Sequence, residues 1–372
     1  MIVRPLTEYC TLNMGQSPDS KTYNTQGNGL PFYQGNADFG ETHPITRVWC
    51  SAPVKVAEEG DILISVRAPI GAMNMAVERC CIGRGLAALT PIRNKCSKQF
   101  LYYALQSKVD SLIAQGTGST FKAISKKVLE ATCIPAYSTI EQEQIAETIG
   151  HVDNTIAARR KQLALLDQLV KSRFIELFGD QTANPYGWQQ TSIGACCTLK
   201  SGTSLPADKE NEGGAIPYVK VGDMNYPGNE QYITTSSRFV SEQTAGTGVF
   251  PVGTVVFPKR GGAIGTNKKR LTRLPICADL NVMGVTAGGR LTPQYLMAYF
   301  DTVDLGTLNN GSSVPQINNK DIAPLLICLP PMALQKQFAA FVEQTDKSKL
   351  AVQKGLQELE ILKKSLMQQY FG

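Results

Sequence analysis

The sequence contains two copies of one pattern, and this duplication constrains the fold more than any other feature. At an offset of 193 residues, which separates Gly372 from Gly179, identical residues recur from the middle of each copy to its end. Near the start of each copy the offset is 187, where Cys10-Thr11-Leu12 matches Cys197-Thr198-Leu199. A repeated sequence specifies a repeated structural unit. The 372 residues are therefore expected to form two similar domains, a number that also suits the length.

Each copy begins with a glycine-rich, strand-like part and ends in a long helical part. Short apolar runs bounded by glycine or proline, at 61–66 and 254–257, are typical of strands. In the helical parts, apolar residues recur with mostly 4-3 spacing, which is typical of a coiled coil. An unbroken helix over 144–178 would be about 52 Å long at 1.5 Å per residue. The positions expected to mediate helix pairing and partner binding are Ile145, Val152, Leu163, Leu166, Phe174, Val342, Val352, Leu356, Leu359 and Leu366.

These features predict an α/β (α+β) fold with an internal pseudo-two-fold duplication, in which two long antiparallel coiled-coil helices join two mixed domains. The predicted segments are a globular domain at 1–136, a helix at 137–183, a second globular domain at 184–330 and a second helix at 331–372. The alternative is a pair of ordinary amphipathic helices that cover the sheets.

Composition disfavours several classes of function. Hydrophobic residues make up 42% of the chain and charged residues 18%, and no apolar run is long enough to span a bilayer, so we expect a soluble, cytoplasmic protein. The ten cysteines form no C-x-x-C pair and there are only two histidines, which disfavours a zinc site or a Cys-His catalytic pair. The sequence has no G-x-x-x-x-G-K-[ST] loop for ATP. We therefore expect this chain to hold no catalytic residue, metal or cofactor.

A cluster of cations in the second copy is the clearest candidate binding feature. Six lysines and arginines lie within 259–273, and no acidic residue lies between Pro251 and Ala278. Such a cluster is typical of a phosphate-binding surface, and the alternative is a solvated loop with incidental charge. Polar and aromatic residues also alternate at 32–36 and 218–226; Asn and Gln pair with adenine edges, and Lys and Arg with guanine. The candidate DNA-binding residues are Tyr33, Gln34, Asn36, Arg67, Asn74, Lys122, Lys220, Asn225, Lys259, Arg260, Asn267, Lys268, Lys269, Arg270 and Arg273.

The order of the motifs resembles the specificity subunit of type I restriction-modification systems, and the resemblance covers nearly the whole chain. The motifs that carry it are G-D-I-L-I-S-V-R-A-P-I-G at 60–71, G-S-T-F-K-A-I at 118–124, I-P-A-Y-S-T-I-E-Q-E-Q-I-A at 134–146, K-S-R-F-I-E-L-F-G at 171–179, N-P-Y-G-W at 184–188, I-P-Y-V-K-V-G-D-M at 216–224 and the terminal L-M-Q-Q-Y-F-G.

This resemblance implies two target-recognition domains, each reading one half of a bipartite, gapped duplex DNA site. It also implies that the helices dock two methyltransferase subunits, to which restriction or translocase subunits can be added. S-adenosylmethionine, ATP and Mg²⁺ would be bound by those partners, and this chain would be a non-catalytic subunit in host defence. The first copy departs from the family pattern, because it begins close to its first strand and its basic cluster is sparse. Two alternatives are a specificity subunit that works with a fused methyltransferase-nuclease and a duplicated scaffold protein that does not bind DNA.

Overall fold

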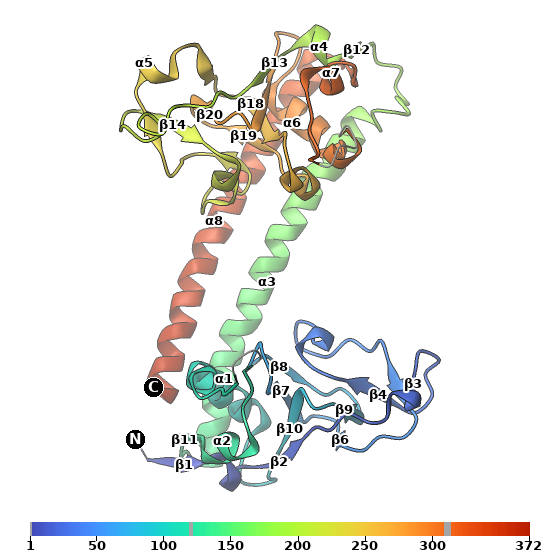
Figure 1. Cartoon of the computed structure of the whole chain (residues 1–372), viewed down its shortest axis with the longest axis vertical. Helices are drawn as coiled ribbons and strands as arrows, with labels where there is room; N and C mark the ends of the chain where they lie inside the picture. The colour runs from blue at the N-terminus through green and yellow to red at the C-terminus, as the bar shows by residue number, and fades with distance from the viewer. Residues whose placement is uncertain (1, 119–121, 309–313) are drawn as a thin grey trace. The chain divides into compact units, whose positions relative to one another are not determined.

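A computed structural model describes residues 2–118, 122–308 and 314–372 (Figure 1). Its contacts divide the chain into two compact units. The first unit comprises Met1–Arg160 and Lys354–Gly372, and the second unit comprises Lys161–Gln353. Each unit therefore combines one globular region with part of each long helix, whereas the sequence predicted the helices as separate segments.

The first unit contains three sheets and two helices that precede the first long helix. Its strands are β1 (Val3–Pro5), β2 (Cys10–Met14), β3 (Tyr23–Asn24), β4 (Leu30–Tyr33), β5 (Trp49–Cys50), β6 (Val56–Ala57), β7 (Ile62–Ser65), β8 (Met73–Met75), β9 (Cys80–Ile82), β10 (Leu86–Pro91) and β11 (Cys133–Pro135). Its helices are α1 (Lys98–Ala114), α2 (Lys126–Ala131) and the first part of α3 (Thr139–Phe178), with 3-10 turns at Leu6–Glu8, Ser20–Thr22 and Asn36–Asp38. The sheet orders are β2-β10-β7-β8, β3-β5-β4-β9-β6 and β1-β11.

The second unit repeats the main features of this plan, with additional short helices and different strand numbers in its two larger sheets. Its strands are β12 (Gln190–Ser192), β13 (Cys197–Ser201), β14 (Ile216–Val219), β15 (Tyr232–Ile233), β16 (Phe239–Val240), β17 (Val249–Phe250), β18 (Thr254–Pro258), β19 (Arg270–Thr272), β20 (Ile276–Ala278), β21 (Val282–Ala287) and β22 (Leu326–Cys328). Its helices are α4 (Ile193–Cys196), α5 (Glu242–Ala245), α6 (Pro293–Thr302), α7 (Asn319–Ile322) and the first part of α8 (Met332–Phe371), with 3-10 turns at Val221–Asn225, Gly246–Gly248, Gly262–Thr266 and Leu305–Leu308. The sheet orders are β13-β21-β18-β19-β15, β16-β14-β20-β17 and β12-β22.

One parallel strand pair occupies the same place in both units and positions the candidate site. Strand β4 pairs in parallel with β9, with Phe32 opposite Cys81, and β14 pairs in parallel with β20, with Tyr218 opposite Cys277. All four of these side chains are buried. The chain leaves each central strand into a short 3-10 turn, so the residue directly after β4 and the residue directly after β14 are structural counterparts.

The main core of each unit lies between its larger sheet and its helices. In the first unit, Ile62 and Leu89 of the sheet pack in one cluster with Phe100 of α1 and Ile149 of α3. In the second unit, the corresponding cluster includes Phe257, Phe300 of α6 and Phe338 of α8. Because these side chains lie at 0% exposure, they hold each sheet firmly against its helices.

The two long helices pack against each other in opposite directions within each unit. In the first unit, ion pairs join Asp153 to Lys363 at 2.7 Å and Arg160 to Glu360 at 2.8 Å. In the second unit, Lys349 pairs with Asp167 at 2.6 Å, and the Phe174 and Phe338 rings lie 5.6 Å apart. The mixed α/β domains and long paired helices expected from the repeat are confirmed. Both long helices have 40 residues, and the ends of the helices also cover the sheets. The two interpretations, helices that pair with each other and helices that cover the sheets, therefore each describe part of α3 and α8.

Candidate nucleic-acid interface

In both units, the backbone N–H of the residue after the central strand donates to an aspartate of the following 3-10 turn, which lies four residues later in the first unit and three residues later in the second. The Gln34 backbone N–H donates to an Asp38 carboxylate oxygen at 2.7 Å, and the Lys220 N–H donates to an Asp223 carboxylate oxygen at 2.7 Å. Each aspartate lies in the 3-10 turn that follows the strand, where a carboxylate satisfies N–H groups that the turn leaves without partners. Gln34 and Lys220 therefore occupy equivalent positions after their strands. The side chain at this position is an amide in the first unit and a cation in the second.

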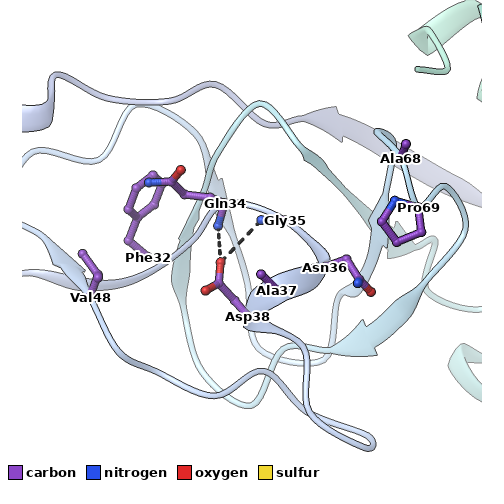
Figure 2. Close-up of a pocket in the computed structure, with 9 residues that line it drawn as sticks. All are labelled: Phe32, Gln34, Gly35, Asn36, Ala37, Asp38, Val48, Ala68 and Pro69. Atoms are coloured by element: carbon purple, nitrogen blue, oxygen red, sulfur yellow. Dashed lines mark hydrogen bonds between the residues drawn. The ribbon is translucent and has the colours of Figure 1, made fainter. Parts of the chain in front are cut away.

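A surface depression of about 440 Å³ lies beside Gln34 in the first unit (Figure 2). Figure 2 shows the Asp38 carboxylate directed to the backbone nitrogens of Gln34 and Gly35. The remaining wall is largely apolar. The lining residues are Phe32, Gln34, Gly35, Asn36, Ala37, Asp38, Val48, Ala68 and Pro69.

Two predicted cations lie on the segments that border this depression. Arg67 is exposed and directly precedes the lining residues Ala68 and Pro69. Lys122 is also exposed, and its carbonyl accepts a hydrogen bond from the Ala68 N–H at 3.0 Å. The first unit therefore gathers an amide pair and two cations, although these residues are far apart in the sequence.

Two predicted site residues of the first unit are buried, which corrects their assignment as DNA contacts. Tyr33 is 1% exposed, and its hydroxyl is 2.7 Å from the Thr46 hydroxyl. Asn74 is 1% exposed; its amide donates to the Gly40 carbonyl at 3.2 Å and accepts from the Gly40 N–H at 3.0 Å. Both side chains therefore brace the domain interior and are not available to a partner in this conformation.

The exposed cation after strand β18 is the counterpart of Arg67 in the second unit. Arg260 is exposed and forms an isolated bridge with Gln316, as Arg67 does with Ala123. Lys259 is half-buried and donates to the Ser201 hydroxyl at 2.9 Å. Burial, and to a smaller extent the neighbouring Arg260, lowers the pKa of Lys259. Arg260 is thus the exposed cation of the two, whereas Lys259 is partly covered and bonded to Ser201.

Three of the six clustered cations are instead used inside the second unit. Lys269 is 4% exposed and donates to the Val303 carbonyl at 2.6 Å and the Asn267 side-chain oxygen at 2.9 Å. Burial lowers its pKa, whereas nearby Asp301 and Asp304 act in the opposite direction. The predicted DNA contact of Lys269 is therefore corrected to a structural role.

Arg270 and Arg273 also make intramolecular contacts. Arg270 is half-buried and donates to the Asn229 carbonyl and to the Lys269 carbonyl, and burial lowers its pKa. The Arg273 guanidinium lies 3.8 Å from the Tyr232 ring centroid and pairs with Asp346 of α8 at 3.0 Å. Arg270 contacts the segment before β15, and Arg273 joins β19 to α8. Both side chains stay partly exposed, so their DNA contacts stay a prediction.

The remaining predicted residues of the second unit bond to one another or to nearby side chains. Lys268 donates to the side-chain oxygen of the exposed Asn225. Asn267 has a left-handed backbone, and its side-chain oxygen accepts from the Leu305 N–H at 2.9 Å as well as from Lys269. Asn225 and Asn267 are exposed and Lys268 is half-buried, so the DNA contacts of all three stay a prediction.

Lys220 has a partner that the sequence did not reveal. Its ammonium lies 2.6 and 2.7 Å from the two carboxylate oxygens of Glu210, and both side chains remain partly exposed. Glu210 precedes β14 in a long loop, outside every motif that suggested a function. Only the folded loop brings this carboxylate to the end of the strand.

The predicted partner-binding positions on the long helices lie mainly inside the chain. Ile145, Phe174, Val342 and Val352 are buried, and the other six, Val152, Leu163, Leu166, Leu356, Leu359 and Leu366, are half-buried. The four buried positions are therefore corrected from partner contacts to contacts within the chain. The exposed apolar side chains of the helices are Ile140, Leu165, Leu169, Ile175, Leu350, Ile361 and Leu362.

The described part of the chain contains neither a candidate metal centre nor a candidate membrane span. Residues 2–118, 122–308 and 314–372 contain no grouping of three or more His, Cys, Asp or Glu side chains that could hold a metal ion. No helix in those same ranges is both long and apolar enough to cross a membrane.

The duplicated mixed domains and the long paired helices define a class of two-unit proteins built on an internal repeat. The chain belongs to the family described as the type I restriction modification DNA specificity domain, whose sequence profile matches residues 1–168 and 185–361.

Curated relatives of this family cover different shares of the chain. A candidate specificity subunit of the MjaX type I restriction enzyme of Methanocaldococcus jannaschii is 40% identical over 164 residues, which span 44% of this chain and 39% of that protein. The MjaIX type I restriction enzyme specificity subunit of the same organism is 22% identical over 387 aligned positions, which cover 95% of this chain and 88% of the relative.

Two solved structures share the fold over almost the full length. The type I restriction-modification S subunit from M. genitalium has a TM-score of 0.63 at 16% identity, covering 100% of this chain and 96% of the other. A chain from a structural study of complex assembly and conformational transition in the type I system has a TM-score of 0.60 at 18% identity. The match covers 99% of this chain and 97% of the other.

Proposed function

We propose that this chain is the DNA-reading subunit of a type I restriction-modification complex and binds a bipartite, gapped duplex site with one half-site per unit. One observation carries the proposal: Gln34 and Lys220 directly follow equivalent parallel strands of the two units but present different side-chain chemistry. A duplicated reader with different side chains suits an asymmetric site, because amide and ammonium groups favour different base edges.

Cations at the surface of both units would supply affinity that does not depend on sequence. In the first unit these are the exposed Arg67 and Lys122, and in the second they are the exposed Arg260 with the half-buried Lys259 and Lys268. Arginine and lysine bind phosphate oxygens and position a protein on the duplex, whereas base contacts determine the sequence. The buried Lys269 would contribute to the fold of the second unit and not to phosphate binding.

The exposed apolar side chains of the long helices would dock two methyltransferase subunits, and restriction or translocase subunits would join through them. Leu165 and Leu169 are 53% and 48% exposed on α3, and Ile361 and Leu362 are 70% and 46% exposed on α8. Leu165 and Leu169 are four residues apart and therefore lie on one face of α3, which can contact a partner, while the adjacent Ile361 and Leu362 add exposed apolar surface on α8. In this assembly, catalysis, S-adenosylmethionine, ATP and Mg²⁺ belong to the partner subunits.

The salt dependence of duplex binding tests this proposal. The full-length chain, purified with its methyltransferase, should bind duplex DNA with an affinity that falls linearly in log-log form as salt rises. Arg67→Ala and Arg260→Ala should each reduce the magnitude of the slope by about one. Arg4→Ala, which removes an exposed cation paired with Glu8, is the control and should leave the slope unchanged. Salt-independent binding, or no binding to duplex, would favour a protein scaffold.

A further inference from the structure

The matched strand-end positions carry information about which base pairs the two units recognise. Gln34 follows β4 and Lys220 follows β14, and each backbone N–H is held by a carboxylate of the next turn. The backbone carbonyl of the preceding residue accepts a hydrogen bond in both units. The Tyr33 carbonyl accepts from the Gly83 N–H at 2.8 Å, and the Val219 carbonyl accepts from the Asp279 N–H at 2.9 Å. The strand pairing matches Gln34 with Lys220, whereas the turns that follow differ: Gly35 precedes the first 3-10 turn and its N–H also donates to Asp38, while Lys220 itself directly precedes the second turn.

In the first unit, Gln34 places a donor and an acceptor beside an apolar wall. One amide can bind adenine through N6 and N7 together, and apolar groups contact the methyl group of thymine. Val48, Ala68 and Pro69 provide apolar groups in the same depression as the exposed Gln34. Asp38 is turned to the backbone, where its carboxylate accepts from both the Gln34 and the Gly35 N–H. This combination matches the major-groove edge of an A·T pair.

In the second unit, the same position carries a donor and an acceptor on two different side chains. The Lys220 ammonium donates to both carboxylate oxygens of Glu210, at 2.6 and 2.7 Å, so the two groups are held next to each other. Their side chains are 31% and 24% exposed, which leaves surface for a ligand. Lysine binds O6 and N7 of guanine, and a glutamate accepts from N4 of cytosine. A hydrogen-bonded Lys-Glu pair therefore matches the adjacent acceptor and donor edges of a G·C pair.

We propose that the position after the central parallel strand is a base-reading position in each unit, with Gln34 specifying an A·T pair in one half-site and Lys220 with Glu210 specifying a G·C pair in the other. This inference rests on the proposed DNA-reading function and extends it to the bases read at one position of each half-site. The two half-sites should consequently differ at one structurally equivalent position.

The test is selection of bound sequences from a library of random duplexes. The full-length chain is purified in complex with its methyltransferase, and the base preference at each position of the selected motif is measured. The wild-type motif should contain an A·T pair that becomes about 5- to 150-fold less favoured in Gln34→Ala, while the other half-site keeps its sequence. Lys220→Ala should weaken the preference for one G·C pair by a similar factor and leave the base preferences of the first half-site unchanged.

Conservative and exchanging variants separate base reading from a structural role. Lys220→Arg should retain guanine, because arginine binds the same O6 and N7 edge, whereas Lys220→Gln should shift the preference at that position towards adenine. Lys209→Ala is the matched control, since it removes a neighbouring lysine that pairs with Glu212 at 3.0 Å, and should leave the motif unchanged. Gln26→Ala serves in the same way as an exposed amide control for the first unit.

The outcomes distinguish this inference from the proposed function beneath it. If the wild-type complex selects no two-part gapped motif, the proposed function is wrong. If it selects such a motif but Gln34→Ala and Lys220→Ala leave every base preference unchanged, the function stands and the reading positions are wrong. A uniform loss of selection across both half-sites would also overturn the inference, because it would show that these residues support the fold and do not read individual base pairs.

Discussion

Replacing Lys269 should destabilise the second unit without changing its electrostatic contribution to DNA binding. The side chain is 4% exposed and donates to two acceptors, the Val303 carbonyl and the Asn267 side-chain oxygen. Lys269→Ala removes three buried methylene groups, worth about 0.8 kcal/mol each, and leaves two acceptors without their donor at about 1–3 kcal/mol each. Removing a buried ammonium also removes its desolvation cost, which offsets part of the lost free energy of unfolding. The net destabilisation should be about 2–4 kcal/mol.

Thermal unfolding of the purified complex and the salt slope of duplex binding together test this reasoning. A loss of about 2–4 kcal/mol in a unit of this size corresponds to a fall in Tm of about 5–15 °C. The neighbouring Lys268→Ala should have the opposite pattern, with a stability change within about 0.5 kcal/mol and a salt slope reduced in magnitude by about one. The reasoning is refuted if Lys269→Ala leaves Tm unchanged and reduces the salt slope.

Three further predictions concern the core, the thiols and the helix surface. Phe174→Ala removes a ring packed between Phe178 and Phe338, so it should lower the free energy of unfolding by about 3–5 kcal/mol in urea titrations; a loss below about 1 kcal/mol would contradict this packing. Burial raises the pKa of Cys96 from 9.0 to about 12, so its stabilising contribution is complete below pH 9 and should fall by up to about 1.4 kcal/mol per pH unit above it. Cys96→Ala should make the urea midpoint less sensitive to pH between 9 and 12, and an unchanged pH dependence would argue against a buried neutral thiol. Leu169→Glu should weaken methyltransferase association by at least tenfold in titrations with the partner, with Tm preserved, whereas unaltered association would exclude this face from docking.

Local patterns in the sequence were sufficient to predict the repeat, the main strands and the long helices. The apolar run at 61–66 contains β7 at Ile62–Ser65, and the spacing over 144–178 lies within α3 at Thr139–Phe178. These features could be predicted because period and turn residues are properties of neighbouring positions. Gln34 and Lys220 could be selected for a similar reason, since each directly follows a short apolar strand.

The direction and partners of side chains within the site could not be predicted in the same way. Lys268 and Lys269 are adjacent in a basic cluster, yet one lies at the surface and the other donates to the Val303 carbonyl inside the unit. Their separation depends on the loop around Leu305, which the sequence does not place against β19. The same limitation hid Glu210, because only the folded chain brings it to Lys220.

The most direct test of the central claim is genome-wide mapping of N6-methyladenine in cells that express the adjacent methyltransferase gene with or without this chain. Our account predicts a gapped, two-part methylated motif that appears only when the chain is present, with different sequences in its two halves. If the methyltransferase is expressed and active but methylation is the same in both strains, this chain does not determine the DNA sequence that the methyltransferase modifies.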